Sequence, residues 1–253
     1  MNRSIRWRQL VAAPLIALAL GGWVSKDEAF KDLPLGKKVS NPFSIGDVQV
    51  PLPEGEWVVA GRRVSESTAS GAAFTTSATL ASVILVDVAE KKMRSAIMIT
   101  TPLDYGTTAR WNKARECSRQ DMLFSANDEL PQIYSHFCWW TNHRRFSFDG
   151  EWAKRDHIKE MMSGFAANGI PLPGNTLTTG FEMAVGQKYI YLTYDRNPEI
   201  EDISRSRNIG WSESDWHKNR IHEFPDKLQY VEKMKAWAAE WKEKVKQGFH
   251  KKF

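Results

Sequence analysis

The sequence predicts an α+β fold, in which an antiparallel sheet of about seven or eight strands carries one inserted helix and a C-terminal helical segment packed on one face. Three observations lead to this prediction. Short apolar runs rich in β-branched residues recur along the chain and twice return after a short turn, as in hairpins. Apolar residues at helical spacing start near Gly150, and a second helical stripe occupies the C-terminus.

The first 21 residues have the order of a secretory signal peptide. Arg3, Arg6 and Arg8 precede an apolar run at 10–20, and small residues follow it. That run is short for a spanning helix, which needs about 20 apolar residues. We therefore expect residues 1–21 to be a cleaved signal peptide, with an uncleaved membrane anchor as the alternative. The chain is then exported, to the periplasm or the extracellular space if it is bacterial.

The remaining chain divides into a lead-in and one domain. Residues 22–42 are polar and contain two prolines and Gly36, so we expect an extended segment. Residues 43–253 are expected to form a single α+β domain. Within it, 43–50 and 56–64 are predicted strands, and the small residues at 65–71 predict a loop.

A hairpin and a central strand are predicted next. Residues 78–88 and 93–101 form the hairpin around a polar turn, followed by an irregular loop at 102–119 and a short strand at 121–125. A further strand is expected at 132–142. Its alternation puts Phe137 and Trp139 on one face and His136, Cys138, Trp140 and Arg144 on the other, so both of its faces should be covered.

The second half contains the predicted helices. The first begins near Gly150 and ends at Asn168-Gly169. Gly186-Gln187 predicts a tight turn between strands at 176–185 and 188–194. Ser212 and Asp215 resemble a capping box that opens a short helix to about residue 220. Pro225 suits the first position of the last helix, which is predicted to end near residue 247. Its apolar stripe comprises Tyr230, Met234, Trp237, Trp241 and Val245.

Charge and composition narrow the classes of partner. The full chain of 253 residues has a net charge of +5, and loss of the three signal arginines leaves 32 basic against 30 acidic residues, or +2. Such a domain has no global field to recruit nucleic acid, so we expect no nucleic-acid partner. The 11 tryptophans indicate either a tryptophan-rich core or an aromatic platform for a ligand.

The two cysteines, Cys117 and Cys138, predict one disulfide bond, because an isolated pair in an exported protein is usually oxidised. Two free thiols or half of a metal site are the alternatives. The chain has no CxxC motif and no histidine pair at metal-ligand spacing, so we expect no metal site. No motif for a cofactor is present, and none is expected.

The disulfide suggests a ligand site. It would bring one segment carrying Trp111, Arg115 and Arg119 against another carrying His136, Trp140 and Arg144. Arginine forks and aromatic faces suit a small anionic or glycan ligand. The alternative is a stapled loop with solvated arginines and core tryptophans.

The basic C-terminus is a second candidate. Two aromatic residues, Phe249 and Phe253, accompany the lysines that follow Trp241. These lysines are Lys242, Lys244, Lys246, Lys251 and Lys252. This pattern predicts peripheral contact with an anionic membrane surface. The alternative, which we favour, is an ordinary helix end, where cations face the negative end of the helix dipole.

The function class follows from these points. The sequence carries no nucleophile elbow, zincin motif or phosphate-binding loop, which favours a non-enzymatic protein. We expect an exported cell-envelope protein that acts as a binding or interaction module, for a small ligand or another envelope protein. The alternatives are an envelope hydrolase with a dispersed active site and a membrane-anchored surface protein, because triads need not be close in sequence.

Overall fold

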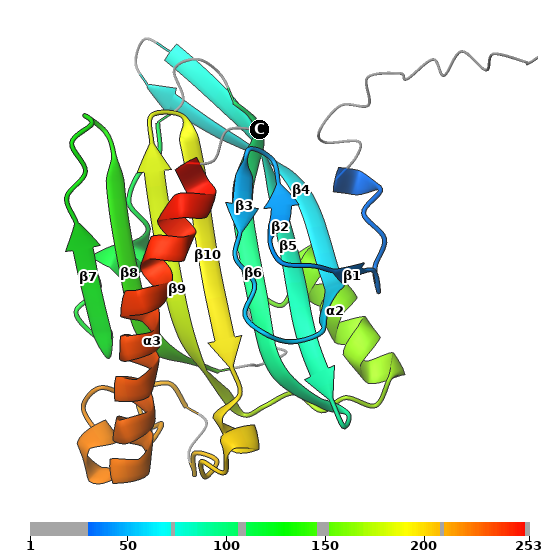
Figure 1. The fold of residues 1–253 in the computed structure, drawn as a ribbon, viewed down its shortest axis with the longest axis vertical. Coiled ribbons are helices and arrows are strands. Elements are labelled where there is room, and N and C mark those ends of the chain that lie inside the picture. The colour runs from blue at the N-terminus through cyan, green and yellow to red at the C-terminus, as the bar shows by residue number, and fades with distance from the viewer. Residues whose placement is uncertain (1–29, 72–73, 106–109, 146–151, 208–209, 251–253) are drawn as a thin grey trace, which may run out of the picture.

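The computed structural model describes residues 30–71, 74–105, 110–145, 152–207 and 210–250. The predicted signal peptide at 1–21 lies outside the described residues, as do Lys251, Lys252 and Phe253. The predicted α+β class is confirmed (Figure 1). An eight-stranded antiparallel sheet has the order β1-β4-β5-β6-β10-β9-β8-β7, and β2 and β3 form a small second sheet.

The strands range in length from two to sixteen residues. They are β1 (Lys38–Val39), β2 (Phe43–Ile45), β3 (Val48–Val50), β4 (Trp57–Gly71), β5 (Phe74–Ala89), β6 (Lys92–Tyr105), β7 (Phe124–Asp128), β8 (His136–Arg145), β9 (Asn175–Val185) and β10 (Lys188–Arg196). The helices are α2 (Asp156–Ala167) and α3 (Pro225–His250), with short 3₁₀ turns η1 (Arg115–Cys117), η2 (Pro198–Glu201) and η3 (Ile221–Glu223).

The large sheet is covered differently on its two faces. On one, the α3 face, α3 and the β2–β3 hairpin lie in front of the sheet in Figure 1 and enclose the largest apolar cluster. On the other, the α2 face, α2 packs behind β4 and β5. This arrangement leaves the α2 face over β8, β9 and β10 for the segment that carries Cys117.

The alternation predicted for β8 is confirmed. Phe137 and Trp139 belong to the cluster on the α3 face, whereas Cys138 and Trp140 pack on the opposite face with Cys117. β8 pairs with β7 on one side and β9 on the other, so it is an internal strand. The strand starts at His136 rather than at 132, because a turn in which Ser135 N–H donates to the Gln132 carbonyl precedes it.

Several other predicted strand bounds are wrong. Residues 43–50 form two strands, since Gly46 has a φ of +55° and turns the chain. The loop predicted at 65–71 is instead the end of β4, paired with β5, because backbone pairing accommodates small side chains. β7 covers 124–128 rather than 121–125. Residues 38–39 of the predicted lead-in pair with β4 as β1.

The segment predicted as an irregular loop at 102–119 begins with strand, because β6 continues to Tyr105. Pro102 is tolerated within β6 because β10 pairs with β6 only as far as Thr100. A proline without an N–H therefore leaves no ladder hydrogen bond unmade on that side.

The helix α2 begins at Asp156, later than Gly150, and ends at the predicted Asn168-Gly169, where Gly169 has a φ of +62°. Its first turn lies directly on β4, where a Cβ atom at Gly61 would clash with the His157 carbonyl. Ile158 and Met161 then pack against the β5 side of the sheet.

The second hairpin is confirmed, and Gly186 in its turn has a φ of +60°. The short helix predicted from Ser212 to residue 220 is wrong, since only η3 follows, at Ile221–Glu223. Asp215 does not cap a helix. It is buried, it accepts the Arg207 N–H, and its carboxylate lies 3.7 Å from Lys227 Nζ of α3.

The last helix starts at Pro225, as predicted, and its stripe faces the core. Tyr230, Met234 and Val245 are buried. Among the basic residues, Lys242 and Lys246 point at β7, with their Nζ atoms 3.3 Å and 2.6 Å from an Asp128 carboxylate oxygen. Neither helix in the described part of the chain has the length and apolar character needed to cross a membrane.

Candidate functional site

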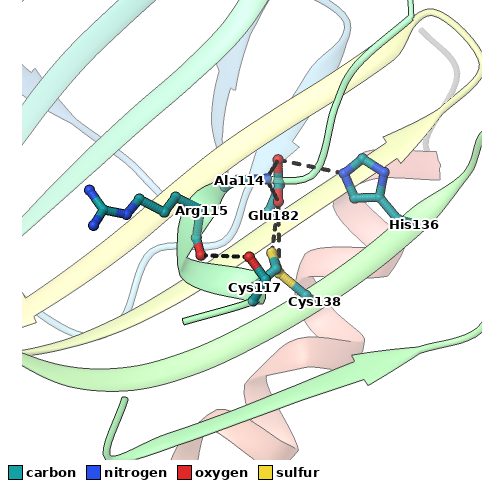
Figure 2. The surroundings of a disulfide bond; sticks show 7 residues. Ala114, Arg115, Cys117, His136, Cys138 and Glu182 are labelled. Atoms are coloured by element: carbon teal, nitrogen blue, oxygen red, sulfur yellow. Dashed lines mark hydrogen bonds and ion pairs between the residues drawn. A yellow bond between two sulfur atoms is a disulfide. The ribbon is translucent and has the colours of Figure 1, made fainter. Parts of the chain in front are cut away.

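The predicted pairing of Cys117 with Cys138 is present, with the two sulfur atoms at disulfide-bonding distance and the Cα atoms 5.9 Å apart. The bond holds η1 against β8 on the α2 face (Figure 2). A second fixing point lies nearby. Trp111 stacks on Tyr189 of β10 with ring centroids 4.7 Å apart, and its indole N–H donates to the Gln187 carbonyl at 2.7 Å. The 110–119 segment is thus fastened across the sheet.

Three of the six residues predicted to bind a ligand converge on one cavity of about 250 Å³, which we call the arginine pocket. They are Arg119, Trp140 and Arg144. Further side chains that line it include Glu116, Arg145, Tyr191 and Trp211. These residues come from four separate stretches of the chain, so the pocket exists only in the folded protein.

A carboxylate orients Arg119. Nε and a terminal nitrogen of Arg119 donate to the two carboxylate oxygens of Asp121, at 2.7 Å and 2.6 Å. This charge-assisted fork lowers the pKa of the Asp121 carboxyl to about 2 and raises the pKa of Arg119. The Arg119 guanidinium also lies 5.1 Å from the Trp211 ring centroid. Arg119 is therefore held at the pocket wall with donors to spare.

Arg144 is held by a buried aspartate. Its terminal nitrogen donates to Asp195 at 3.1 Å. The other Asp195 oxygen accepts the hydroxyls of Thr176 and Thr178 from β9, so the carboxylate is satisfied inside the sheet. A quarter of the Arg144 side chain remains exposed. The arrangement presents a positioned guanidinium to the pocket.

Aromatic side chains form the floor. Trp140 of β8 and Tyr191 of β10 have ring centroids 5.5 Å apart. Trp140 lies over Gly180 of β9, where a Cβ atom would overlap the indole ring. Because Trp140 is only 2% exposed, it packs as a core residue below the pocket, and Tyr191 and Trp211 supply the accessible aromatic surface.

The other three predicted residues lie elsewhere. Arg115 is exposed, and its side chain points away from the disulfide (Figure 2). His136 is buried beside Glu182, with 3.5 Å between Nε2 and a carboxylate oxygen. Trp111 lines a neighbouring cavity of about 220 Å³. Tyr191 lines both cavities, so they adjoin on the α2 face.

Sequence reasoning missed Tyr191, Trp211 and Glu182. The alternation of β10, with Tyr189 and Tyr191 on one face, was a usable signal for the first. Trp211 and Glu182 had no local signal, because their positions depend on the register of β9 and on the path of an irregular segment.

His143 also lines the arginine pocket, and its surroundings favour packing over catalysis. Its ring stacks on Trp211 at 4.0 Å, and its Nε2 lies 3.3 Å from the Trp211 carbonyl oxygen. Burial lowers the pKa of His143 to about 4, so the ring is neutral at pH 7. The hydroxyl of Thr178, a nucleophile type in the same pocket, donates to Asp195 rather than to this ring.

A larger cavity of about 530 Å³ lies beside the C-terminal helix. Its aromatic faces are already occupied. Trp237 and Trp241 stack on each other at 4.9 Å, Arg196 lies over Trp237, and Lys244 lies over Trp241. We therefore regard the arginine pocket as the better candidate for ligand binding.

Comparison with known protein families, with curated proteins and with solved structures finds no match to this chain.

Proposed function

We propose that this protein is an exported cell-envelope protein that acts as a non-enzymatic binding module, and that its arginine pocket takes one small acidic sugar. The supporting observation is the convergence of Arg119, Arg144 and Arg145 with Tyr191 and Trp211 around one cavity. Arginine forks bind carboxylates in two-point geometry, and aromatic rings offer apolar faces to a sugar ring.

The size and charge of the pocket support a ligand with a single carboxylate. A volume of about 250 Å³ is slightly below the roughly 300 Å³ at which sites for drug-sized ligands begin, which suits a monosaccharide. Asp121 and Asp195 already neutralise two of the three arginines, and Glu116 lines the same cavity. Three carboxylates thus accompany the three guanidinium groups, so the pocket has no excess of positive charge that would favour a polyanion.

The hydrolase alternative has less support. A hydrolase that works through a side-chain nucleophile needs that nucleophile and a base in mutual contact. The His143 ring and the Thr178 hydroxyl line the same pocket but are each engaged by a different partner, the Trp211 carbonyl and Asp195.

Titration calorimetry with glucuronate, and with glucose as the neutral control, tests the ligand. We expect glucuronate to bind and glucose to bind far more weakly. Arg119→Ala removes one charged hydrogen-bonding group, which contributes about 1.5–3 kcal/mol, so we expect Kd to rise roughly 10- to 100-fold. The Asp121 side chain is already 42% exposed in the wild type, so its carboxylate stays solvated without Arg119 and the fold should be retained.

The matched control is Arg115→Ala, because Arg115 lies on the same segment, is exposed and does not line the pocket. We expect it to bind like the wild type. The proposal is wrong if glucuronate does not bind, if glucose binds equally well, or if both arginine variants lose affinity to the same extent.

Export is tested by the intact mass of the protein from soluble and membrane fractions of its host. A soluble species shortened by about 19–21 residues supports a cleaved signal peptide. A full-length species in the membrane fraction would instead support the anchored alternative.

A further inference from the structure

A cluster of four side chains lies on the α2 face, where its cysteines pack with Trp140, and none of the four lines the arginine pocket. It comprises Cys117 from η1, His136 and Cys138 from β8, and Glu182 from β9 (Figure 2). Each is at least nine-tenths buried, with exposed fractions of 7%, 6%, 0% and 0%. We call it the Cys₂-His-Glu cluster. Its members belong to three segments that are distant in sequence.

Three of the four residues bring their donor atoms close together, and His136 lies beside one of them, Glu182. One atom each from Cys117, Cys138 and Glu182 lie within 4.8 Å of one another. Nε2 of His136 lies 3.5 Å from a Glu182 oxygen. Thiolate sulfur, imidazole nitrogen and carboxylate oxygen are each ligands that proteins use for Zn²⁺, and four of them match its preferred coordination number.

One polar atom of the cluster, His136 Nε2, is unsatisfied among the described residues when the cysteines are joined. The Glu182 carboxylate accepts the Ala114 N–H at 2.7 Å and 2.8 Å. One of its oxygens lies 2.8 Å from the Cys117 sulfur and 3.7 Å from that of Cys138, but disulfide sulfurs carry no proton to donate. His136 Nε2 has no hydrogen-bond partner among the described residues. His136 Nε2 is thus a buried polar atom without a hydrogen-bond partner beside the cysteine pair and Glu182, which is costly unless something else binds there.

We propose that the dithiol form of the Cys₂-His-Glu cluster binds one Zn²⁺. Binding replaces the two thiol protons, which leave to solvent, and needs no oxidant or reductant. Oxidation by a low-molecular-weight disulfide forms the Cys117–Cys138 bond, cleaves the reagent into two thiolates that take up the electron pair, and releases Zn²⁺. The disulfide and the metal are therefore alternative ways to fasten the 114–118 segment to the sheet. This inference does not depend on the ligand proposed for the arginine pocket.

The test uses the whole protein, reduced with a phosphine that is then removed under anaerobic conditions, with free thiols counted. Co²⁺ is titrated as a coloured probe and Zn²⁺ is added to displace it. We expect one Co²⁺ per chain, with thiolate-to-metal charge transfer and tetrahedral d–d bands, and full displacement by Zn²⁺. The oxidised protein should bind neither ion at this site.

Ligand variants separate this site from simple binding by two thiols. We expect Glu182→Gln and His136→Ala each to weaken Zn²⁺ binding at least 10-fold in the reduced protein. The matched controls are Glu129→Gln and His222→Ala, which change exposed residues outside the cluster and should bind like the wild type.

Thermal unfolding of the reduced protein is a second measure of Zn²⁺ binding, which does not depend on the absorption bands of Co²⁺. Zn²⁺ should raise the Tm of the reduced wild type, or refold it if it is unfolded, and should leave the oxidised protein unchanged. The proposal is overturned if two free thiols are present and no stoichiometric metal binds, or if the Glu182 and His136 variants retain wild-type affinity.

Discussion

At the scale of single residues, two buried histidines are held in the neutral form. Burial is the largest cause that lowers the pKa of both His143 and His157 to about 4, and nearby arginines lower it further. An unfolded histidine has a pKa of about 6.5. Between pH 6.5 and pH 4 the unfolded chain therefore binds more protons than the folded one, and stability falls as the pH decreases.

This linkage predicts acid sensitivity. From pH 7 to pH 5, each buried histidine should lower the free energy of unfolding by about 2 kcal/mol. His143→Phe retains a ring to stack on Trp211 and removes the titration, so its urea midpoint should fall less over this pH range. The control is His222→Asn at an exposed position, and its urea midpoint should fall over this pH range as much as that of the wild type. An equal fall in His143→Phe would contradict the assignment.

For the arginines, the sequence predicted the type of residue at the site but not which arginines reach it. The sequence predicted Arg119, Arg144 and Arg115 alike as ligand-binding residues. In the structure, Arg119 and Arg144 line the pocket, whereas Arg115 is exposed. The difference arises because Asp121 and Asp195 hold the first two in place. Neither ion pair has a signal in the local pattern.

At the scale of elements, a close approach between β8 and β9 builds the floor of the pocket. Trp140 can lie flat only because Gly180 opposite it has no side chain. Gly164 in α2 is different, since it is exposed and a Cβ there would meet nothing within 4 Å.

These two glycines predict opposite effects of one substitution. Gly180→Ala should destabilise the protein by about 1–3 kcal/mol through overpacking. Gly164→Ala should stabilise it by about 0.5–1 kcal/mol, because alanine has the higher helix propensity. Thermal unfolding measures both, at roughly 2–4 °C per kcal/mol for a chain of this size. A neutral Gly180→Ala would show that Trp140 is not seated as described.

Element predictions succeeded where the signal is local. The hairpin turn at Gly186, the end of α2 at Gly169 and the start of α3 at Pro225 each depend on one residue's backbone conformation. They failed where long-range pairing decides, as in the strand formed by 65–71. The helix predicted from Ser212 failed because Asp215 is buried against Lys227 of α3 instead.

At the scale of the whole molecule, the Cys117–Cys138 bond closes a loop with a sequence separation of 21 residues. In the chain-entropy model such a bond stabilises by about 3 kcal/mol. Reduction in the presence of a chelator should therefore lower the free energy of unfolding by about this amount. Urea unfolding of the oxidised and reduced protein measures the difference. A variant with both cysteines changed to serine should not respond to the reductant.

Local sequence patterns were enough to predict the α+β class, the antiparallel hairpins, the two helices and the cysteine pair. These follow from periodicity, turn residues and composition, which act over a few neighbouring residues. Three features became visible only in the folded chain: α2 and α3 cover opposite faces, Glu182 lies next to Cys117, and Arg119, Arg144 and Arg145 share a pocket. Such contacts depend on strand order and register, because a register shift of one residue would turn each side chain to the other face of the sheet.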